Sequence, residues 1–406
     1  MRAPLRIAFV ICAFAAAAFG ACQPGNVTTG VQTSGAIYAV YMPETSCWNG
    51  NVVVFAHGYV APGSGNIIPP DELTIGGLSL PTTFNQLGYA FAASSYSKDG
   101  LAIVEGVNDT HDLVQNILKP QIHPQRVYLI GASEGGLVTT LSAEQLPGVY
   151  NSAGAACGPI GDFQAQINYF GDFRVIFDYF FPDVIPGNAI TIPSYVMGAW
   201  DSTYVPLIEG ALASNPSAAA QLINVLKAPV TSDPTTVAET VIGALWYNVF
   251  GTADANTELH GQPFDNHNRI YLGSSNDLLL NLKVERYKAS PVALGMVASQ
   301  YQTSGKLKMP LVTIHTTGDP VIPYWHETLY TLKTLAAGTL LDRINLPVAN
   351  YGHCTFSAGD ILAAFALIVL RDTGASVSAQ IESELAEPHR KEFADAFRRF
   401  EAAGAQ

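Results

Sequence analysis

Short apolar runs recur along this chain, bounded by turn residues and separated by longer segments with helical periodicity. Runs of this kind, rich in small and β-branched residues, are typical of strands that are buried on both faces. Strands that alternate with helices predict an α/β protein with a mainly parallel, doubly wound sheet. The expected strands are residues 51–56, 90–95, 126–130, 152–157, 311–315 and 342–348, and the expected helices are 104–118, 136–146 and 361–370.

One predicted strand runs directly into a tight turn with a serine at its apex. The turn is residues 131–135, GASEG, with Ser133 at its centre and a predicted helix immediately after it. A turn this tight forces the apical residue into a strained backbone conformation and lifts its hydroxyl above the sheet edge. Because G-x-S-x-G also occurs by chance in a glycine-rich chain, an ordinary glycine turn is the alternative interpretation.

Further polar motifs lie at the ends of three other predicted strands. A His-Gly pair at 57–58 ends the first strand, Asp319 follows the strand at 311–315, and His353 follows the last strand. Chemistry in open parallel sheets gathers at the carboxyl ends of strands. An elbow serine followed in the chain by Asp and then His, after an earlier His-Gly loop, resembles the α/β-hydrolase fold over residues 51–371.

The resemblance implies a catalytic triad. The hydroxyl of Ser133 is a poor nucleophile at neutral pH and needs a base, for which His353 is the candidate. An imidazole needs a carboxylate to hold its tautomer, and Asp319 is the first choice, with Asp162 as the alternative. Three other histidines that follow or lie in predicted elements are weaker candidates for the base: His57, His315 and His326.

The same resemblance assigns an oxyanion hole to the backbone N–H groups of Tyr59 and Glu134. Gly58 and the side chain of Tyr59 are also candidates for contact with the substrate. For the carboxyl group of Glu134 two interpretations stay open, because it would either organise the His-Gly loop or face solvent.

The chain between Ser133 and Asp319 is far longer than one helix and two strands require, which predicts an inserted helical cap or lid. Its opening is dense in aromatic residues, and Phe177 and Phe180 are candidates for an apolar lid over the substrate. The alternative is that they form the core of the cap. The predicted boundaries are 22–160 and 303–378 for the hydrolase core, 161–302 for the cap and 379–406 for a charged, amphipathic C-terminal helix.

The N-terminus predicts a secretory signal peptide over residues 1–21. Arg2 and Arg6 precede the apolar stretch 7–19, and Gly20 and Ala21 form a plausible cleavage site. The apolar stretch is short for a membrane span, and no later segment offers about 20 uninterrupted apolar residues. The sequence therefore predicts a secreted or periplasmic protein without a stable membrane span.

Four cysteines remain after removal of the signal segment, an even number in an oxidising compartment. Cys22 and Cys47 flank a predicted β-hairpin, which makes them a reasonable disulfide pair, although a lipid anchor at Cys22 is an alternative. Cys157 and Cys354 would form the second bridge or remain as buried thiols.

Composition narrows the range of partners. The 406 residues include 20 Lys and Arg against 33 Asp and Glu, a formal net charge of −13. Nucleic-acid binding needs a concentrated basic face, so this balance argues against it. No metal-ligand spacing or phosphate-binding loop is found, and no cofactor is expected.

The predicted activity is that of a carboxylic ester hydrolase that acts through an acyl-serine on a small-molecule or polymeric ester. Cys354 directly after His353 resembles tannases and feruloyl esterases, in which a Cys before the nucleophile is bridged to a Cys after the base. Here Ala132 precedes Ser133, so that bridge cannot form, and Cys157 is a substitute partner. Two alternatives remain: a serine peptidase similar to prolyl oligopeptidases, and a catalytically silent binding protein with the same fold.

Overall fold

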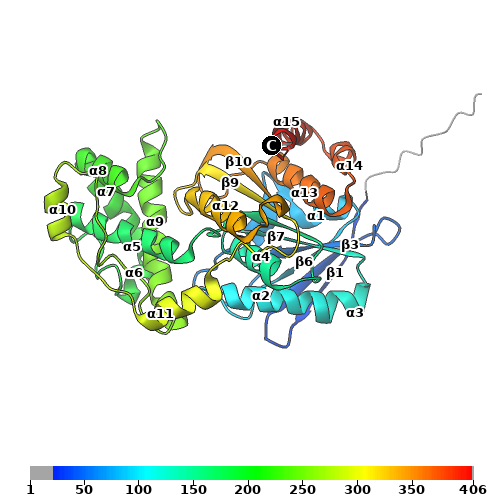
Figure 1. Ribbon diagram of the computed structural model, residues 1–406, viewed down its shortest axis with the longest axis horizontal. Coiled ribbons are helices and arrows are strands. Elements are labelled where there is room, and N and C mark those ends of the chain that lie inside the picture. The colour runs from blue at the N-terminus through cyan, green and yellow to red at the C-terminus, as the bar shows by residue number, and fades with distance from the viewer. Residues whose placement is uncertain (1–21, 405–406) are drawn as a thin grey trace, which may run out of the picture.

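An eight-stranded sheet forms the centre of the computed structural model, which describes residues 22–404 (Figure 1). The predicted signal segment, 1–21, lies outside the described residues. β2 runs antiparallel to both of its neighbours, and every later pair is parallel. In spatial order the strands are β1 (Pro24–Val31), β2 (Ile37–Pro43), β6 (Ala90–Ser94), β3 (Asn51–Ala56), β7 (Arg126–Ala132), β8 (Ser152–Ala156), β9 (Leu311–Gly318) and β10 (Arg343–Tyr351).

This strand order, with the second strand reversed, is that of the α/β-hydrolase fold, so the predicted fold class is confirmed. The parallel strands end at one edge of the sheet, where ligands bind in open α/β folds. A separate two-stranded ribbon, β4 (Thr74–Ile75) and β5 (Leu78–Ser79), follows the short helix η1 (Pro70–Leu73) in the segment between β3 and the next helix.

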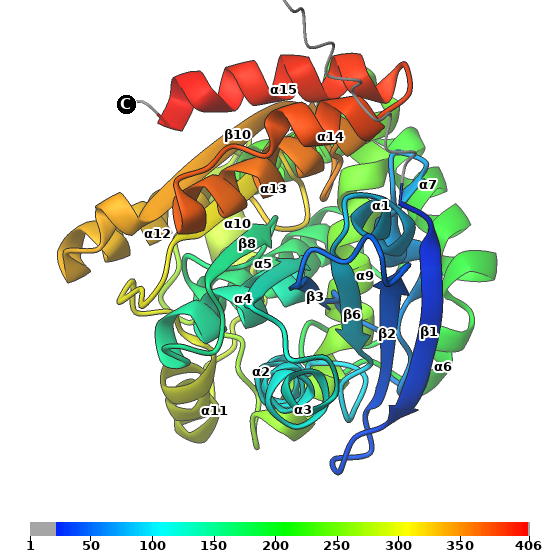
Figure 2. The same ribbon diagram turned by 90° about the vertical axis from the view of Figure 1, so that its right-hand side faces the viewer.

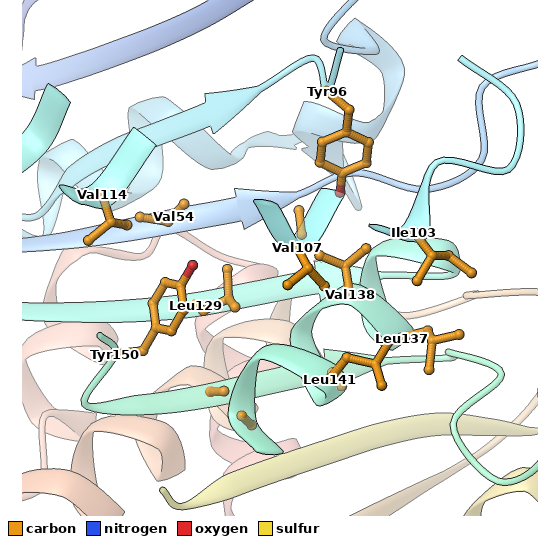
Figure 3. Close-up of a cluster of buried hydrophobic side chains, with 14 of the residues drawn as sticks. Val54, Tyr96, Ile103, Val107, Val114, Leu129, Leu137, Val138, Leu141 and Tyr150 are labelled. Carbon is orange, nitrogen blue, oxygen red and sulfur yellow. The ribbon is translucent and has the colours of Figure 1, made fainter. Parts of the chain in front are cut away.

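Helices cover both faces of the sheet, which explains why its strands read as continuous apolar runs. In β3, Val52, Val54 and Ala56 belong to one buried cluster, whereas Val53 and Phe55 belong to the other. Figure 3 shows part of the first cluster. The helices that contribute to the first cluster are α2 (Ile103–Asp112), η2 (Leu113–Leu118), α3 (Lys119–Ile122), α4 (Glu134–Gln145) and α12 (Trp325–Ala337), and α12 is followed by η5 (Leu340–Asp342). The helices that contribute to the second cluster are α1 (Leu80–Gln86), α13 (Ala358–Thr373), α14 (Ser378–Glu384) and α15 (His389–Gly404).

The C-terminal segment forms two helices, α14 and α15, where a single helix was expected. Pro388 precedes α15 directly, and a proline disfavours helical continuation through the residue before it. Figure 2 shows α15 lying across α13 and α14. Phe393, Phe397 and Phe400 are buried there in the second cluster.

A helical insertion, residues 163–301, lies between β8 and β9 and extends to one side of the sheet (Figure 1). It has a buried apolar cluster of its own, which includes Phe173, Trp200 and Leu245. The boundaries of domains stay a prediction. Its elements are α5 (Phe163–Phe180), α6 (Ser194–Gly198), η3 (Trp200–Tyr204), α7 (Val205–Ser214), α8 (Pro216–Leu226), α9 (Thr235–Glu258), α10 (Asp277–Lys283), α11 (Pro291–Met296) and η4 (Val297–Tyr301).

Among residues 22–404, none of the helices has the length and apolar character needed to cross a membrane.

Phe365 on α13 joins the helical layer to the sheet, and its truncation tests this packing. Its ring is buried and contacts those of Phe84, Tyr89 and Tyr128, with centroids 4.7, 5.2 and 6.0 Å away. Phe365→Ala should lower the free energy of unfolding by about 3–5 kcal/mol through lost burial and a residual cavity. Urea denaturation measures the effect, with Leu332→Ala on the exposed side of α12 as a control expected to change stability by less than about 0.5 kcal/mol.

Candidate active site

Ser133 occupies the apex of the turn between β7 and α4 in a strained conformation. Its φ is 56° and its ψ is −122°, values that L residues rarely adopt. Small neighbours make the turn possible: a Cβ at Gly135 would lie 2.0 Å from the carbonyl oxygen of Ala56, and one at Gly131 would lie 2.3 Å from the carbonyl oxygen of Gly135. The elbow is therefore pressed against the end of β3, and any larger residue at position 135 would collide with that strand.

Ser133, His353 and Asp319 form one hydrogen-bonded series. Nδ1 of His353 lies 2.7 Å from Oδ2 of Asp319, and Nε2 lies 2.9 Å from Oγ of Ser133. An ionised carboxylate only accepts hydrogen bonds, so Nδ1 carries the proton of a neutral ring. Nε2 is then left with its lone pair toward the serine hydroxyl, which is the tautomer a general base requires.

The Asp319 carboxylate is completely buried and is surrounded by donors. Its Oδ1 accepts hydrogen bonds from the N–H groups of Val321 and Ile322, both at 2.9 Å. Burial alone would raise the pKa of Asp319, but the charge of His353 and hydrogen bonds from His315 and His353 outweigh it. The net effect holds the pKa of this carboxyl well below its usual range. Asp319 is thus expected to be an anion at neutral pH.

Asp162, the alternative acid, has a different function in the structure. Its Oδ1 accepts from the N–H of Ala165 at 3.0 Å and from Nε2 of Gln302 at 2.7 Å. It caps the N-terminus of α5 and is not hydrogen-bonded to His353.

The loop that carries His353 is tied to the sheet on both sides of the histidine. The carbonyl oxygen of Gly352 accepts from the Thr316 hydroxyl at 2.6 Å, and Cys354 forms a disulfide with Cys157 at the end of β8. Cys157 is thus the partner of Cys354, as one of the two alternatives for these cysteines predicted. This cross-link fixes the histidine loop to the strand that neighbours the elbow.

The second expected disulfide, between Cys22 and Cys47, is also present. Its Cα atoms are 5.7 Å apart, at the base of the β1–β2 hairpin. A sulfur in a disulfide is not available to carry a lipid, which disfavours the lipid-anchor alternative at Cys22.

One expected oxyanion donor, Glu134, follows the serine in the chain, and the other, Tyr59, lies in a loop that approaches the serine in space. Glu134 is the first residue of α4, so its N–H has no partner within the helix and points out of its positive end. Tyr59 follows Gly58 in the loop after β3. A Cβ at Gly58 would lie 3.2 Å from Cβ of Ser133, which shows how closely this loop approaches the serine.

Glu72, which the sequence analysis did not single out, holds this loop. Its Oε2 accepts from the N–H of Gly58 at 2.6 Å. Burial raises the pKa of Glu72 to about 7, against the opposing effects of the Gly58 hydrogen bond and the charge of His353. The sequence around Glu72, an Asp-Glu pair in a proline-rich loop, does not indicate its hydrogen bond to Gly58, because only the fold brings η1 over the end of β3.

The carboxyl group of Glu134 neither faces solvent nor holds the His-Gly loop. It is buried, with 7% of the residue exposed, and its Oε1 accepts from the N–H of Ala102 at 3.0 Å. Glu134 thereby anchors the segment that leads into α2. Burial raises the pKa of Glu134 to about 8, although the Ala102 hydrogen bond opposes the shift.

A cavity of about 120 Å³ opens at Ser133 between the sheet edge and the helical insertion. Its lining is mainly apolar. Phe177 is fully buried in the core of the insertion, Phe180 packs against that core, and neither lines the cavity, so their positions do not support the expected substrate contacts. The larger aromatic and aliphatic side chains at the cavity are those of Tyr59, Leu101, Phe163, Ile167, Phe170, Ile190, Tyr247, Phe264 and Ile322.

One group of potential metal ligands occurs among residues 22–404, formed by Cys157, His353 and Cys354. The two sulfur atoms are joined in the disulfide, so they are not thiolates and do not have the chemistry of a metal site.

Known proteins show only distant similarity to this chain. No protein-family model matches the sequence, and no curated protein matches it significantly. Similar solved structures include an acylaminoacyl peptidase of Pyrococcus horikoshii (12% identity, TM-score 0.42, covering 82% of this chain and 38% of that one). Others are feruloyl esterase B of Aspergillus oryzae (12%, 0.48, 86% and 80%) and brefeldin A esterase, a bacterial homologue of human hormone-sensitive lipase (14%, 0.41, 93% and 77%). The chain thus spans well under half of the peptidase, and similarities this distant carry no information on the substrate.

The two raised carboxyl pKa values predict how stability depends on pH. Glu134 and Glu72 hold their protons to higher pH in the folded state, about 8 and about 7, than at their ordinary value of 4.5. The unfolded state therefore binds fewer protons in this range, and each group lowers the free energy of unfolding as the pH rises. In urea denaturation from pH 5 to 9, Glu134→Gln should gain stability relative to the wild type up to about pH 8 and then level off.

The matched variant Glu72→Gln should level off earlier, near pH 7. Stability profiles of either variant that run parallel to that of the wild type would show that the corresponding carboxyl is ionised in the folded protein throughout.

Proposed function

We propose that this protein is a secreted serine hydrolase of carboxylic esters, with Ser133 as nucleophile, His353 as general base and Asp319 as the acid of the triad. The observation that carries the proposal is the hydrogen-bonded series from Oγ of Ser133 through the His353 ring to the buried carboxylate of Asp319. A serine on a strained turn with an oriented imidazole at 2.9 Å has the arrangement that acyl transfer requires.

In this mechanism Oγ of Ser133 attacks the ester carbonyl while Nε2 of His353 takes its proton. Asp319 stabilises the imidazolium that forms, without itself being protonated. The N–H groups of Glu134 and Tyr59 stabilise the oxyanion of the tetrahedral intermediate. His353 then protonates the departing alcohol, and a water activated by the same nitrogen hydrolyses the acyl-serine.

The cavity favours an apolar or aromatic acyl group. Aromatic and aliphatic side chains from the helical insertion, together with Tyr59, Leu101 and Ile322 from the core, surround the space next to Ser133. Burial of apolar substrate surface there would supply binding energy at about 25 cal/mol per Å². The insertion would then act as a cap that shapes the substrate site, which is the role predicted for residues 161–302.

Secretion is part of the proposal. It is supported by the signal-like pattern of residues 1–21 and by two disulfides, which persist in oxidising compartments.

Replacement of the nucleophile tests the reaction class. With p-nitrophenyl esters of graded chain length, Ser133→Ala should lower kcat by about 10⁴-fold or more, because the covalent route is lost. The variant removes one hydroxyl and should leave the denaturation midpoint near that of the wild type. Aminoacyl-proline anilides are assayed in parallel.

Faster cleavage of the anilides than of the esters would favour the serine peptidase. No Ser133-dependent turnover of either class would favour a silent binding protein.

A substitution in the cavity tests where the acyl group lies. A Cβ at Gly251 on α9 would meet only the Tyr59 hydroxyl, at 3.8 Å, so a larger side chain there projects into the cavity. Gly251→Leu should reduce kcat/KM for a p-nitrophenyl octanoate by about tenfold or more while that for the acetate changes little.

Gly243→Leu is the matched control. It lies on the same helix, makes the same exchange, and does not line the cavity. An equal loss for octanoate and acetate in Gly251→Leu would place the acyl group elsewhere.

A further inference from the structure

His315 on β9 is a buried ionisable residue that the proposed chemistry does not use. Its side chain has no solvent exposure. Nδ1 lies 3.1 Å from Oε1 of Glu327, and Nε2 lies 2.8 Å from the carbonyl oxygen of Ile322. A carbonyl oxygen and an ionised carboxylate both only accept hydrogen bonds, so each ring nitrogen must donate. The geometry therefore makes His315 a doubly protonated, positively charged imidazolium.

Glu327 on α12 supplies the negative charge on one side of this ring. Its Oε2 accepts from the guanidinium of Arg343 on β10 and, at 2.8 Å, from the hydroxyl of Thr313. Burial would raise the pKa of Glu327, but the Arg343 charge and the His315 hydrogen bond outweigh it and hold the pKa below its ordinary value. Glu327 is thus an anion between two cations.

Asp319 supplies the negative charge on the other side. Nε2 of His315 lies 3.5 Å from Oδ2 of Asp319, the same oxygen that accepts from Nδ1 of His353. Arg343, Glu327, His315 and Asp319 therefore form a series of alternating charges. Their side chains are at most 2% exposed, and the series ends at the imidazole that contacts Ser133.

A buried series of charges is a poor device for stability, because desolvation offsets much or all of the Coulombic gain, and a well-packed apolar substitute is often as stable. The position of this series gives it another use. The fixed imidazolium behind Asp319 attracts its carboxylate and restricts its rotation, so that one oxygen stays aimed at His353.

We propose that Arg343, Glu327 and His315 form a charge chain that positions the carboxylate of Asp319, with protonated His315 as the positioning residue next to it. This inference rests on the proposed function of Ser133, His353 and Asp319. The charge chain acts on the reaction only through Asp319 and does not contact the substrate.

The protonation of His315 should limit activity at alkaline pH. Burial lowers the pKa of His315, but hydrogen bonds to Asp319 and Glu327 and their negative charges raise it to about 9. The charges of the charge chain therefore alternate below about pH 9, and the alternation is lost above this pH, where His315 becomes neutral. The ionisable groups around the ring are Glu327 and His326 on α12, Asp319 and Tyr324 on the loop after β9, Arg343 on β10 behind Glu327, and His353 beyond Asp319.

The test is the pH profile of Glu327→Gln. The amide keeps the shape of the side chain but removes its charge, so the pKa of His315 should fall. The alkaline limb of the kcat profile should then move to lower pH by about one to two units. At neutral pH, kcat should fall on the order of 10- to 100-fold, with little change in KM, because misalignment of a catalytic group acts on the transition state.

Glu144→Gln is the matched control, because Glu144 is also a buried acceptor on a helix. It accepts from the N–H of Gly305 and from the Tyr330 hydroxyl, and it makes no hydrogen bond to Arg343, Glu327 or His315; its nearest link to them is the Tyr330 ring, which lies against the Arg343 guanidinium. Its alkaline limb should stay at the wild-type position even where its stability falls. A limb that stays in place in a folded Glu327→Gln protein would overturn the proposal.

A measurement on the wild type remains decisive where Glu327→Gln does not fold. With ¹⁵N-labelled histidine, the His315 ring, assigned through its contact with the Tyr324 ring, should be protonated at pH 7.5 and titrate near the alkaline limb of kcat. A neutral ring at pH 7.5, or a titration that does not coincide with that limb, would overturn the proposal. The ring titration does not depend on turnover, so failure of the Ser133 reaction is distinguished from failure of the chain.

Discussion

The buried carboxylate of Asp319 is the constraint on which the rest of the site depends. An ion without solvent exposure is tolerated only where donors replace the water it has lost. Asp319 receives two backbone N–H groups, the His353 ring and, at longer range, the His315 ring. These donors come from one loop, from β9 and from the end of β10. The parallel pairing of β9 with β10 and the disulfide at Cys354 are what bring the His353 donor to the carboxylate.

Close backbone packing at the sheet edge imposes the second requirement. The elbow can lie over the end of β3 only because Gly135 has no side chain, and the loop after β3 can pass next to Ser133 only because Gly58 has none. The first contact sets the position of the serine above the sheet edge, and the second sets the distance between Tyr59 and the serine. Both glycines were visible in the sequence as part of short motifs, but their reason becomes clear only when β3 and β7 are paired.

Features local to the chain could be predicted, and features that depend on the packing of distant segments could not. The expected strands from 51–56 to 342–348 are present within a few residues, because apolar runs bounded by turns specify them strongly. The pairing of Cys157 with Cys354 was one of two alternatives, supported by the position of Cys157 at a strand end on the same edge, and the structure shows it. Glu72 was missed because its partner, the N–H of Gly58, has no side chain to signal it. Phe177 was predicted to contact the substrate because its segment is dense in aromatic residues. This density does not indicate which face of α5 packs into the core of the insertion.

Three carboxyl groups lie close to one serine, and their environments drive their protonation states apart. Asp319 has many donors, and its pKa is held far below the ordinary value. Glu134 is also buried but has a single N–H donor, so its pKa rises to about 8 and the neutral form is favoured at pH 7. Glu72, with one donor and a nearby imidazole, lies between them at about 7. In the proposed mechanism, the imidazolium that forms near neutral pH would therefore meet one fully ionised partner, and the N–H of Glu134 would stabilise the oxyanion without a full negative charge on its own side chain.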